Sequence, residues 1–339
     1  MRRMLLTAGL AMIAAAVVVA VAVAAKPGNG QPTGTATVFL PNPVADLQNQ
    51  SLTDQKDADY AALAPAYHRV TLTNLDGSGF LRGDWANITS ETGNPAYSPT
   101  NDFNYHRNDD RFEQVMAYYW VTEAQKYIQS LGFGSSRRPV NMESQDLRIN
   151  QWGADNSFSW DKKDMIKLGK GGVDDAEDAE VILHELGHAI QDSQQTPFGY
   201  GFSVEARSIG EGFGDYWAAT VSNRLAPTPD PACIADWDSV SYDPTAPHCL
   251  RRVDTNLHYP KDLNGAVHHD GQIWSHALWD IRNALGNVKA DTLILEGQFG
   301  QRDPTMPQLA ESTVAAAQSL YGNAAANTVR AAFETRGIL

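Results

Sequence analysis

Residues 184–188 read His-Glu-Leu-Gly-His and lie in the apolar run 181–190, Val-Ile-Leu-His-Glu-Leu-Gly-His-Ala-Ile. Residues four apart on a helix share one face, so His184 and His188 can bind one metal ion from the same side, while Glu185 points to its open coordination position. Two imidazoles and a carboxylate would be costly in such a buried helix without a shared partner. The stretch therefore predicts a helix that carries part of a metal site.

A second segment can complete that site. The sequence Glu-Gly-Phe-Gly-Asp at 211–215 offers Glu211 as a third ligand, and Asp215, one helical turn later, can accept a hydrogen bond from the outer ring nitrogen of a ligating histidine. Three glycines lie inside the predicted helix 204–223, each costing about 1 kcal/mol relative to alanine. We therefore expect the backbone to approach the metal site or another helix closely there. The ligand set predicts one catalytic zinc ion.

The chain has 339 residues, of which 42% are hydrophobic, so it can bury a substantial core. Its formal net charge of −14 disfavours nucleic acid as a partner, and we expect a monomer that acts on proteins or peptides. Its two cysteines, Cys233 and Cys249, are predicted to form a disulfide, because the chain carries an export signal.

That signal occupies residues 1–25, where Met-Arg-Arg precedes an apolar run from Met4 to Ala25 that ends in small residues. The pattern predicts a signal peptide cleaved near Ala25 and an extracellular, secreted protein. The run is also long enough to span a bilayer, so an uncleaved membrane anchor with the active site outside the cytoplasm is the alternative.

Strand patterns come first in the chain and helices last, which predicts an α+β protein with two lobes. A Gly/Pro-rich linker at 26–34 precedes a sheet-rich lobe, 35–193, which ends in the zinc helix. A mainly helical lobe follows at 194–339, with a Pro/Asp-rich surface insertion at 224–263. The expected strands cover 35–40, 67–75, 156–160 and 165–168, and the other expected helices cover 111–131, 270–285, 305–321 and 323–335.

An acidic run, Asp174 to Glu180, precedes the zinc helix. The positive end of the helix dipole explains acids at this position without any ligand. A bound calcium ion is the other interpretation.

These segments resemble a gluzincin metallopeptidase of the thermolysin and fungalysin type, over about residues 105–285. The glutamate segment, extended to Ile-Gly-Glu-Gly-Phe-Gly-Asp-Tyr-Trp at 209–217, is closer to the fungalysin branch, as are the stretches 112–119 and 127–133. The resemblance implies a zinc-dependent endopeptidase in which His184, His188 and Glu211 hold the metal and Asp215 orients His184. It also implies that Glu185, as general base, activates a zinc-bound water for peptide hydrolysis.

The same resemblance implies further roles. Asn264-Gly-Ala-Val-His268 is similar to the family segment whose histidine stabilises the transition-state oxyanion, which favours His268 over His269 and His276. The aspartate that the thermolysin pattern places five residues earlier is Leu263 here, with Asp262 beside it.

Tyr200 is a candidate second donor to the oxyanion. Asn156, Ser157 and Phe158 resemble the edge strand that binds an extended peptide in this family. Val181 either lines a pocket for the residue after the scissile bond or packs in the core.

The same residues also test other classes of zinc protein. A metzincin has Gly and His three and six positions after the second motif histidine, where this chain has Gln191 and Gln194, so that class is excluded. The aminopeptidase branch usually has an upstream exopeptidase motif that the chain lacks. The remaining alternative, a non-catalytic extracellular binding or adhesion protein stabilised by zinc, has no use for Glu185.

Overall fold

The computed structural model describes residues 32–89, 94–150, 153–196, 199 and 201–339, which belong to one compact unit. The predicted signal segment 1–25 and most of the predicted linker lie outside these ranges. Within them, no helix combines the length and the apolar character needed to cross a membrane.

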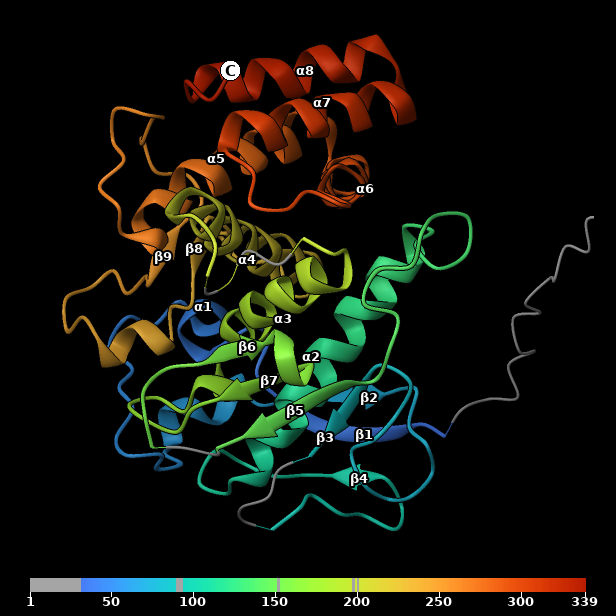
Figure 1. The fold of residues 1–339 in the computed structure, drawn as a ribbon. Helices are drawn as coiled ribbons and strands as arrows, with labels where there is room; N and C mark the ends of the chain where they lie inside the picture. The colour runs from blue at the N-terminus through green and yellow to red at the C-terminus, as the bar shows by residue number, and fades with distance from the viewer. Residues whose placement is uncertain (1–31, 90–93, 151–152, 197–198, 200) are drawn as a thin grey trace, which may run out of the picture. The chain divides into compact units, whose positions relative to one another are not determined.

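Two small sheets form from the first half of the chain (Figure 1). In the first, β1 (Gly34–Val38) pairs antiparallel with β2 (His68–Leu72) and parallel with β4 (Asp102–Phe103). The second has the order β3-β5-β7-β6, with β3 (Ala86–Ile88), β5 (Gln145–Ile149) and β7 (Met165–Leu168) parallel. Strand β6 (Phe158–Trp160) closes it antiparallel to β7 and is therefore an edge strand.

Helix α2 (Arg111–Ser130) packs against both sheets. Phe112, Val115 and Ile128 are fully buried on the sheet-facing stripe. Helix α2 also contacts helix α3 (Ala179–Ser193), which holds the His-Glu-Leu-Gly-His stretch. The sheets thus support α3 directly through β6 and β7 and indirectly through α2.

On its other side α3 packs against α4 (Val204–Leu225), and α4 packs against α5 (Val267–Leu285). The remaining helices, α6 (Asn287–Gln298), α7 (Met306–Tyr321) and α8 (Asn323–Thr335), follow in the C-terminal part. Figure 1 shows α3 between the sheets and these helices. This arrangement confirms the predicted α+β, two-lobed fold class; the lobe boundary at residue 193 stays a prediction.

The acidic run before α3 is buried, and its members have separate partners. Asp178 caps α3 by accepting a hydrogen bond from the Glu180 amide, which agrees with an acid at a helix start. Glu177 accepts two hydrogen bonds from the buried Arg107 guanidinium. The Glu180 carboxylate accepts hydrogen bonds from Ser222 and the backbone of Ala235. Most of the run is therefore held by protein groups.

Several expected elements differ in the structure. The sequence did not predict β3, β5 or α6. Strand β3 has only three residues. The apolar residues of α6 form a cluster at 293–295 rather than a periodic stripe. The strand expected at 156–160 is shortened to β6. Helix α5 begins at Val267, three residues earlier than expected, so His268 lies in its first turn.

The insertion 224–263 is only partly the surface segment that its sequence predicted, because residues 232–239 are buried. Its Pro/Asp-rich composition indicated exposure, but Ile234, Trp237 and Val253 are buried because they pack on the rest of the chain. The predicted disulfide is confirmed: Cys233 and Cys249 are bonded, with Cα atoms 5.5 Å apart. Cys233 lies in β8 (Cys233–Ile234), which pairs with β9 (Arg251–Arg252).

Candidate metal centre and active-site cleft

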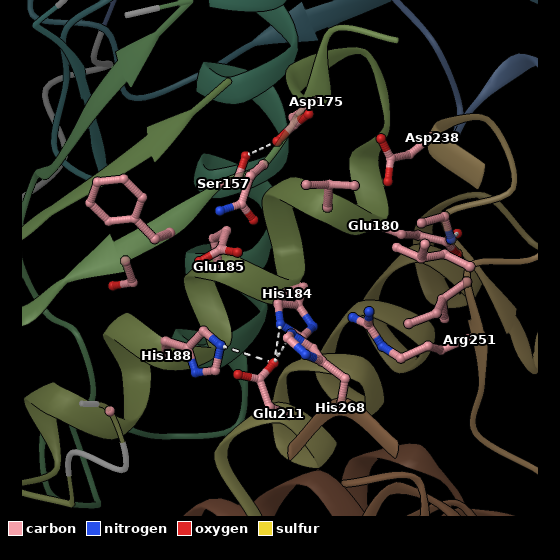
Figure 2. Close-up of a pocket in the computed structure, with 18 of the residues that line it drawn as sticks. Ser157, Asp175, Glu180, His184, Glu185, His188, Glu211, Asp238, Arg251 and His268 are labelled. Carbon is pink, nitrogen blue, oxygen red and sulfur yellow. Dashed lines mark hydrogen bonds and ion pairs between the residues drawn. The ribbon is translucent and has the colours of Figure 1, made fainter. Parts of the chain in front are cut away.

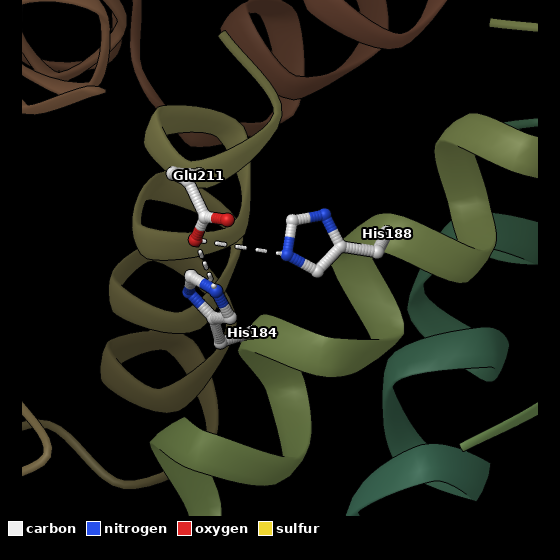
Figure 3. Close-up of side chains that lie close together, drawn as sticks. All are labelled: His184, His188 and Glu211. Atoms are coloured by element: carbon white, nitrogen blue, oxygen red, sulfur yellow. Dashed lines mark ion pairs between the residues drawn. The ribbon is translucent and has the colours of Figure 1, made fainter. Parts of the chain in front are cut away.

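Helices α3 and α4 bring His184, His188 and Glu211 together (Figure 3). One ligand atom from each lies within 4.8 Å of the other two. The Nε2 atoms of His184 and His188 lie 3.2 and 3.9 Å from Glu211 Oε2. Two imidazole nitrogens and one carboxylate oxygen at this spacing fit a zinc ion with an open coordination position.

Glycines allow the two helices to come this close. A Cβ added at Gly187 of α3 would lie 2.9 Å from the Gly214 Cα, and one added at Gly214 would lie 2.8 Å from two atoms of the His184 ring. At Gly212, a Cβ would lie 2.3 Å from the backbone oxygen of Gly271 in α5. The close approach that the sequence predicted for α4 therefore occurs on two sides of this helix. Gly214 faces α3 at the metal centre, and Gly212 faces α5.

Asp215 fixes the orientation of the His184 ring. Its Oδ1 lies 2.8 Å from His184 Nδ1, so Nε2 is the nitrogen that faces Glu211. Arg251 donates two hydrogen bonds to the Asp215 carboxylate, each 2.8 Å long. Burial alone would raise the pKa of Asp215, but the charge of Arg251 and the bonds from both partners lower it to about 2. Asp215 is therefore an anion that can polarise the ring.

The surroundings of the two histidines shift their pKa values in opposite directions. Burial lowers the pKa of His188 to about 4, so its ring is neutral at pH 7, the form that binds metals. Burial would also lower the pKa of His184, but its bonds to Asp215 and Glu211 raise that pKa to about 10. A metal ion that bound His184 Nε2 would displace a proton, so metal binding by these residues would be coupled to proton release.

Glu185 lies beside the three residues and lines the same cleft (Figure 2). Burial raises the pKa of its carboxyl group to about 7, a range suited to exchanging protons at neutral pH. Its Oε2 atom is buried and has no hydrogen-bond partner among the described residues. The carboxylate is thus available to a group that enters the cleft.

The cleft has a volume of about 490 Å³ and extends beyond the metal centre. Its walls include Val181 from α3 and a group from the insertion, namely Ile234, Ala235, Asp238, Leu250 and Arg251. Arg251 had no signal in the sequence, because nothing in its local pattern links it to Asp215. The insertion therefore contributes directly to the cleft.

The three residues expected to bind a peptide, Asn156, Ser157 and Phe158, all line the cleft. Only Phe158 lies in the edge strand β6, while the other two precede it. The Ser157 hydroxyl donates a hydrogen bond to the carboxylate of Asp175. Their role in substrate binding stays a prediction.

Among the three candidate histidines, His268 lies at the metal centre. Its Nε2 is 3.1 Å from Glu211 Oε2, and its side chain is 59% exposed to the cleft and solvent. His269 instead contacts Asp270, and His276 contacts the backbone oxygen of Thr255.

The chain has Leu263 where the thermolysin pattern has an aspartate, and the neighbouring Asp262 does not replace that aspartate as a partner of His268. Asp262 accepts a hydrogen bond from the backbone of His258, so its carboxylate is engaged away from His268. Tyr200 lies outside the described residues, and its proposed role is not addressed by the structure.

Comparisons with known proteins relate the chain to metallopeptidases. The sequence model of the fungalysin metallopeptidase family matches residues 153–338. Among solved structures, the chain is similar to the precursor of protealysin, a metalloproteinase from Serratia proteamaculans, with a TM-score of 0.58 and 17% identity. That match covers 75% of this chain and 85% of the other. At this identity it shows the fold alone. No curated protein sequence matches the chain.

The close contact at Gly214 makes the metal centre testable without altering any candidate ligand. Gly214→Ala forces a Cβ against the His184 ring, so we expect zinc affinity to fall by about 10- to 100-fold, as when the support of a ligating histidine is lost. The control is Gly153→Ala, where a Cβ meets no described heavy atom within 4 Å. Competition with a fluorescent chelator measures the affinity; unchanged zinc binding in Gly214→Ala would contradict this geometry.

Proposed function

This chain belongs to the fungalysin metallopeptidase family and is a zinc-dependent endopeptidase, and we propose that its zinc is held by His184, His188 and Glu211 with Glu185 as general base. The observation that carries the proposal is the position of Glu185, a buried carboxylate beside the three candidate ligands. A site that only stabilised the fold would need the ligands and not this fourth group.

The residues around the cleft divide the reaction between them. When bound, zinc supplies Lewis acidity that polarises the peptide carbonyl and lowers the pKa of water. Glu185 accepts the proton of the attacking water and returns it to the leaving amine nitrogen. His268 donates a hydrogen bond to the carbonyl oxygen as that oxygen gains negative charge. Asp215 keeps His184 in the tautomer whose Nε2 faces Glu211 and would be free to bind zinc.

The substrate enters the same cleft. Asn156, Ser157 and Phe158 support binding of an extended peptide beside β6, because an edge strand can pair with an added chain. Val181 lies one helical turn before Glu185, so its side chain shares the face of α3 that meets the scissile bond. We assign Val181 to the pocket for the residue that follows that bond.

Replacing the proposed base tests the mechanism. In Glu185→Gln the side chain keeps its size but cannot accept a proton, so we expect kcat on casein peptides to fall by about 10²- to 10⁴-fold. One zinc per chain should remain. Glu123→Gln, which alters an acid paired with Lys126 on α2, is the matched control and should keep full activity. Wild-type rates in Glu185→Gln, with zinc bound, would refute the proposed base.

The role of His268 can be separated from that of its neighbour. His268→Ala removes a donor to the developing oxyanion, and we expect kcat to fall by about 10²- to 10³-fold with little change in KM. His269→Ala removes a histidine that contacts Asp270 and should leave both constants close to wild type. An equal loss in the two variants would mean that the start of α5, rather than the His268 ring, is responsible.

We also propose that the protein is exported through the segment 1–25 and that cleavage near Ala25 releases it. Members of the family are typically secreted, and the segment has a positive start, an apolar run and small residues at its end. N-terminal sequencing of protein recovered outside expressing cells should give a start near Lys26. Recovery only in membranes, with the segment intact, would instead assign it as an anchor.

A further inference from the structure

Three carboxyl groups from separate segments meet beside the active-site cleft. Asp155 precedes β6, Asp175 begins the short helix Asp175–Glu177 before α3, and Asp238 begins the short helix Asp238–Ser241 in the insertion. One oxygen of each lies within 4.8 Å of the other two. Asp175 and Asp238 line the cleft, and Figure 2 shows them away from the two histidines of the metal centre.

Two of the three residues are buried, and all three carboxyl groups are incompletely paired. The exposed fractions of Asp175 and Asp238 are 2% and 4%. The Oδ1 atom of each of the three aspartates is buried and has no hydrogen-bond partner among the described residues. Leaving such oxygens unpaired is costly, and placing three carboxylates together adds repulsion between like charges. The cluster therefore needs a partner that supplies positive charge.

Among the described side chains, Arg251 acts on Asp238 through its charge, but that charge does not offset the effect of burial on the Asp238 pKa. None of the three aspartates forms an ion pair with a Lys or Arg of the described ranges, and Arg251, which lines the same cleft, is engaged by Asp215. Burial is the main cause that raises the pKa of all three carboxyl groups, that of Asp175 to about 7. A cation at the cluster would reverse that effect by stabilising the charged forms.

The donor set identifies the class of cation. The cluster offers carboxylate oxygens and, beside them, the Ser157 hydroxyl, which contacts Asp175. It contains no histidine or cysteine. Oxygen-only sites with several carboxylates suit calcium, which takes six to eight oxygen ligands, whereas zinc favours nitrogen and sulfur. Because the Oδ1 atoms are enclosed, a small ion fits them better than a substrate side chain entering from the cleft.

We propose that Asp155, Asp175 and Asp238 bind a calcium ion. The ion links the segment before α3 to the insertion, which contributes Ile234, Leu250 and Arg251 to the cleft. It therefore holds one wall of the cleft in place. The proposal does not rest on the zinc chemistry.

The backbone around Asp155 is packed to bring these segments together. Gly172 has a φ of +65°, and a Cβ added there would lie 2.4 Å from Asp155 Oδ2 and 2.5 Å from Ser241 Oγ. Ser241 also accepts a hydrogen bond from the Val173 amide. The chain leading to Asp175 thus contacts both the segment of Asp155 and that of Asp238.

Calcium binding can be measured on the full chain with zinc loaded and the Glu185→Gln change in place, which prevents self-digestion during the experiment. Calorimetric titration should give one calcium per chain with the zinc content unchanged. Calcium at about 100 times its dissociation constant should raise the thermal midpoint by roughly 5 °C, with sodium chloride of equal ionic strength as the control. No calcium binding, or no rise beyond that of the salt, would overturn the proposal.

Variants locate the site. Asp238→Asn should weaken calcium binding at least about tenfold and abolish the rise in midpoint, because it removes one carboxylate ligand. Asp155→Asn, at a less buried position, provides a second test if the first variant does not fold. Asp243→Asn, in the same part of the insertion but exposed, should bind like wild type.

Two results would overturn the assignment to these residues. One is wild-type calcium affinity in both cluster variants, and the other is an equal loss in Asp243→Asn. A third result would assign the cluster to substrate: no calcium binding, together with loss in Asp238→Asn of cleavage next to Lys or Arg in a peptide library run without the Glu185→Gln change.

Discussion

The close crossing of α3 and α4 is the constraint on which the metal centre depends. Gly187 and Gly214 face each other there, and the His184 ring lies against the backbone of Gly214. Since Glu211 and Asp215 lie on the same helix as Gly214, one backbone contact sets the position of the ring relative to both. A larger residue at the crossing would separate the helices and change every distance among the candidate ligands. The close crossing therefore outweighs the low helix propensity of the glycines.

A second constraint is electrostatic and centres on Asp215. This carboxylate is fully buried, and it joins α4 to α3 through His184 and to β9 through Arg251. A buried charge with one partner removed is strongly unfavourable, by about 3–5 kcal/mol. The short sheet of β8 and β9 and the disulfide beside it thus have a role at the metal centre, because they hold Arg251 in reach. The insertion is tied to α4 by charge as well as by packing.

The sequence predicted what local spacing can encode. Helical periodicity located α3, and the glycines of α4 indicated a close approach that the structure contains. Local spacing could not predict pairs of residues that come together only in the tertiary fold. Arg251 lies 36 residues from Asp215, with no periodic pattern between them. Composition also misled at Trp237, since Pro and Asp around it indicated the surface while its ring is buried. The roles of the candidate ligands and of His268 stay predictions.

The acidic run before α3 shows why neighbouring residues of one type can have different roles. Asp178 satisfies the helix start, and Glu177 neutralises Arg107, so each has a counterpart within the fold. Asp175 lies just before these two residues, yet its carboxylate turns toward Asp155 and Asp238 rather than toward a base. In the sequence all three are acids near one helix end, and the dipole accounts for them equally well. The three acids differ in the group that each of them contacts. Segments far apart in the chain supply those groups. A cation requirement at one position of such a run therefore follows from the tertiary arrangement and not from the density of acidic residues.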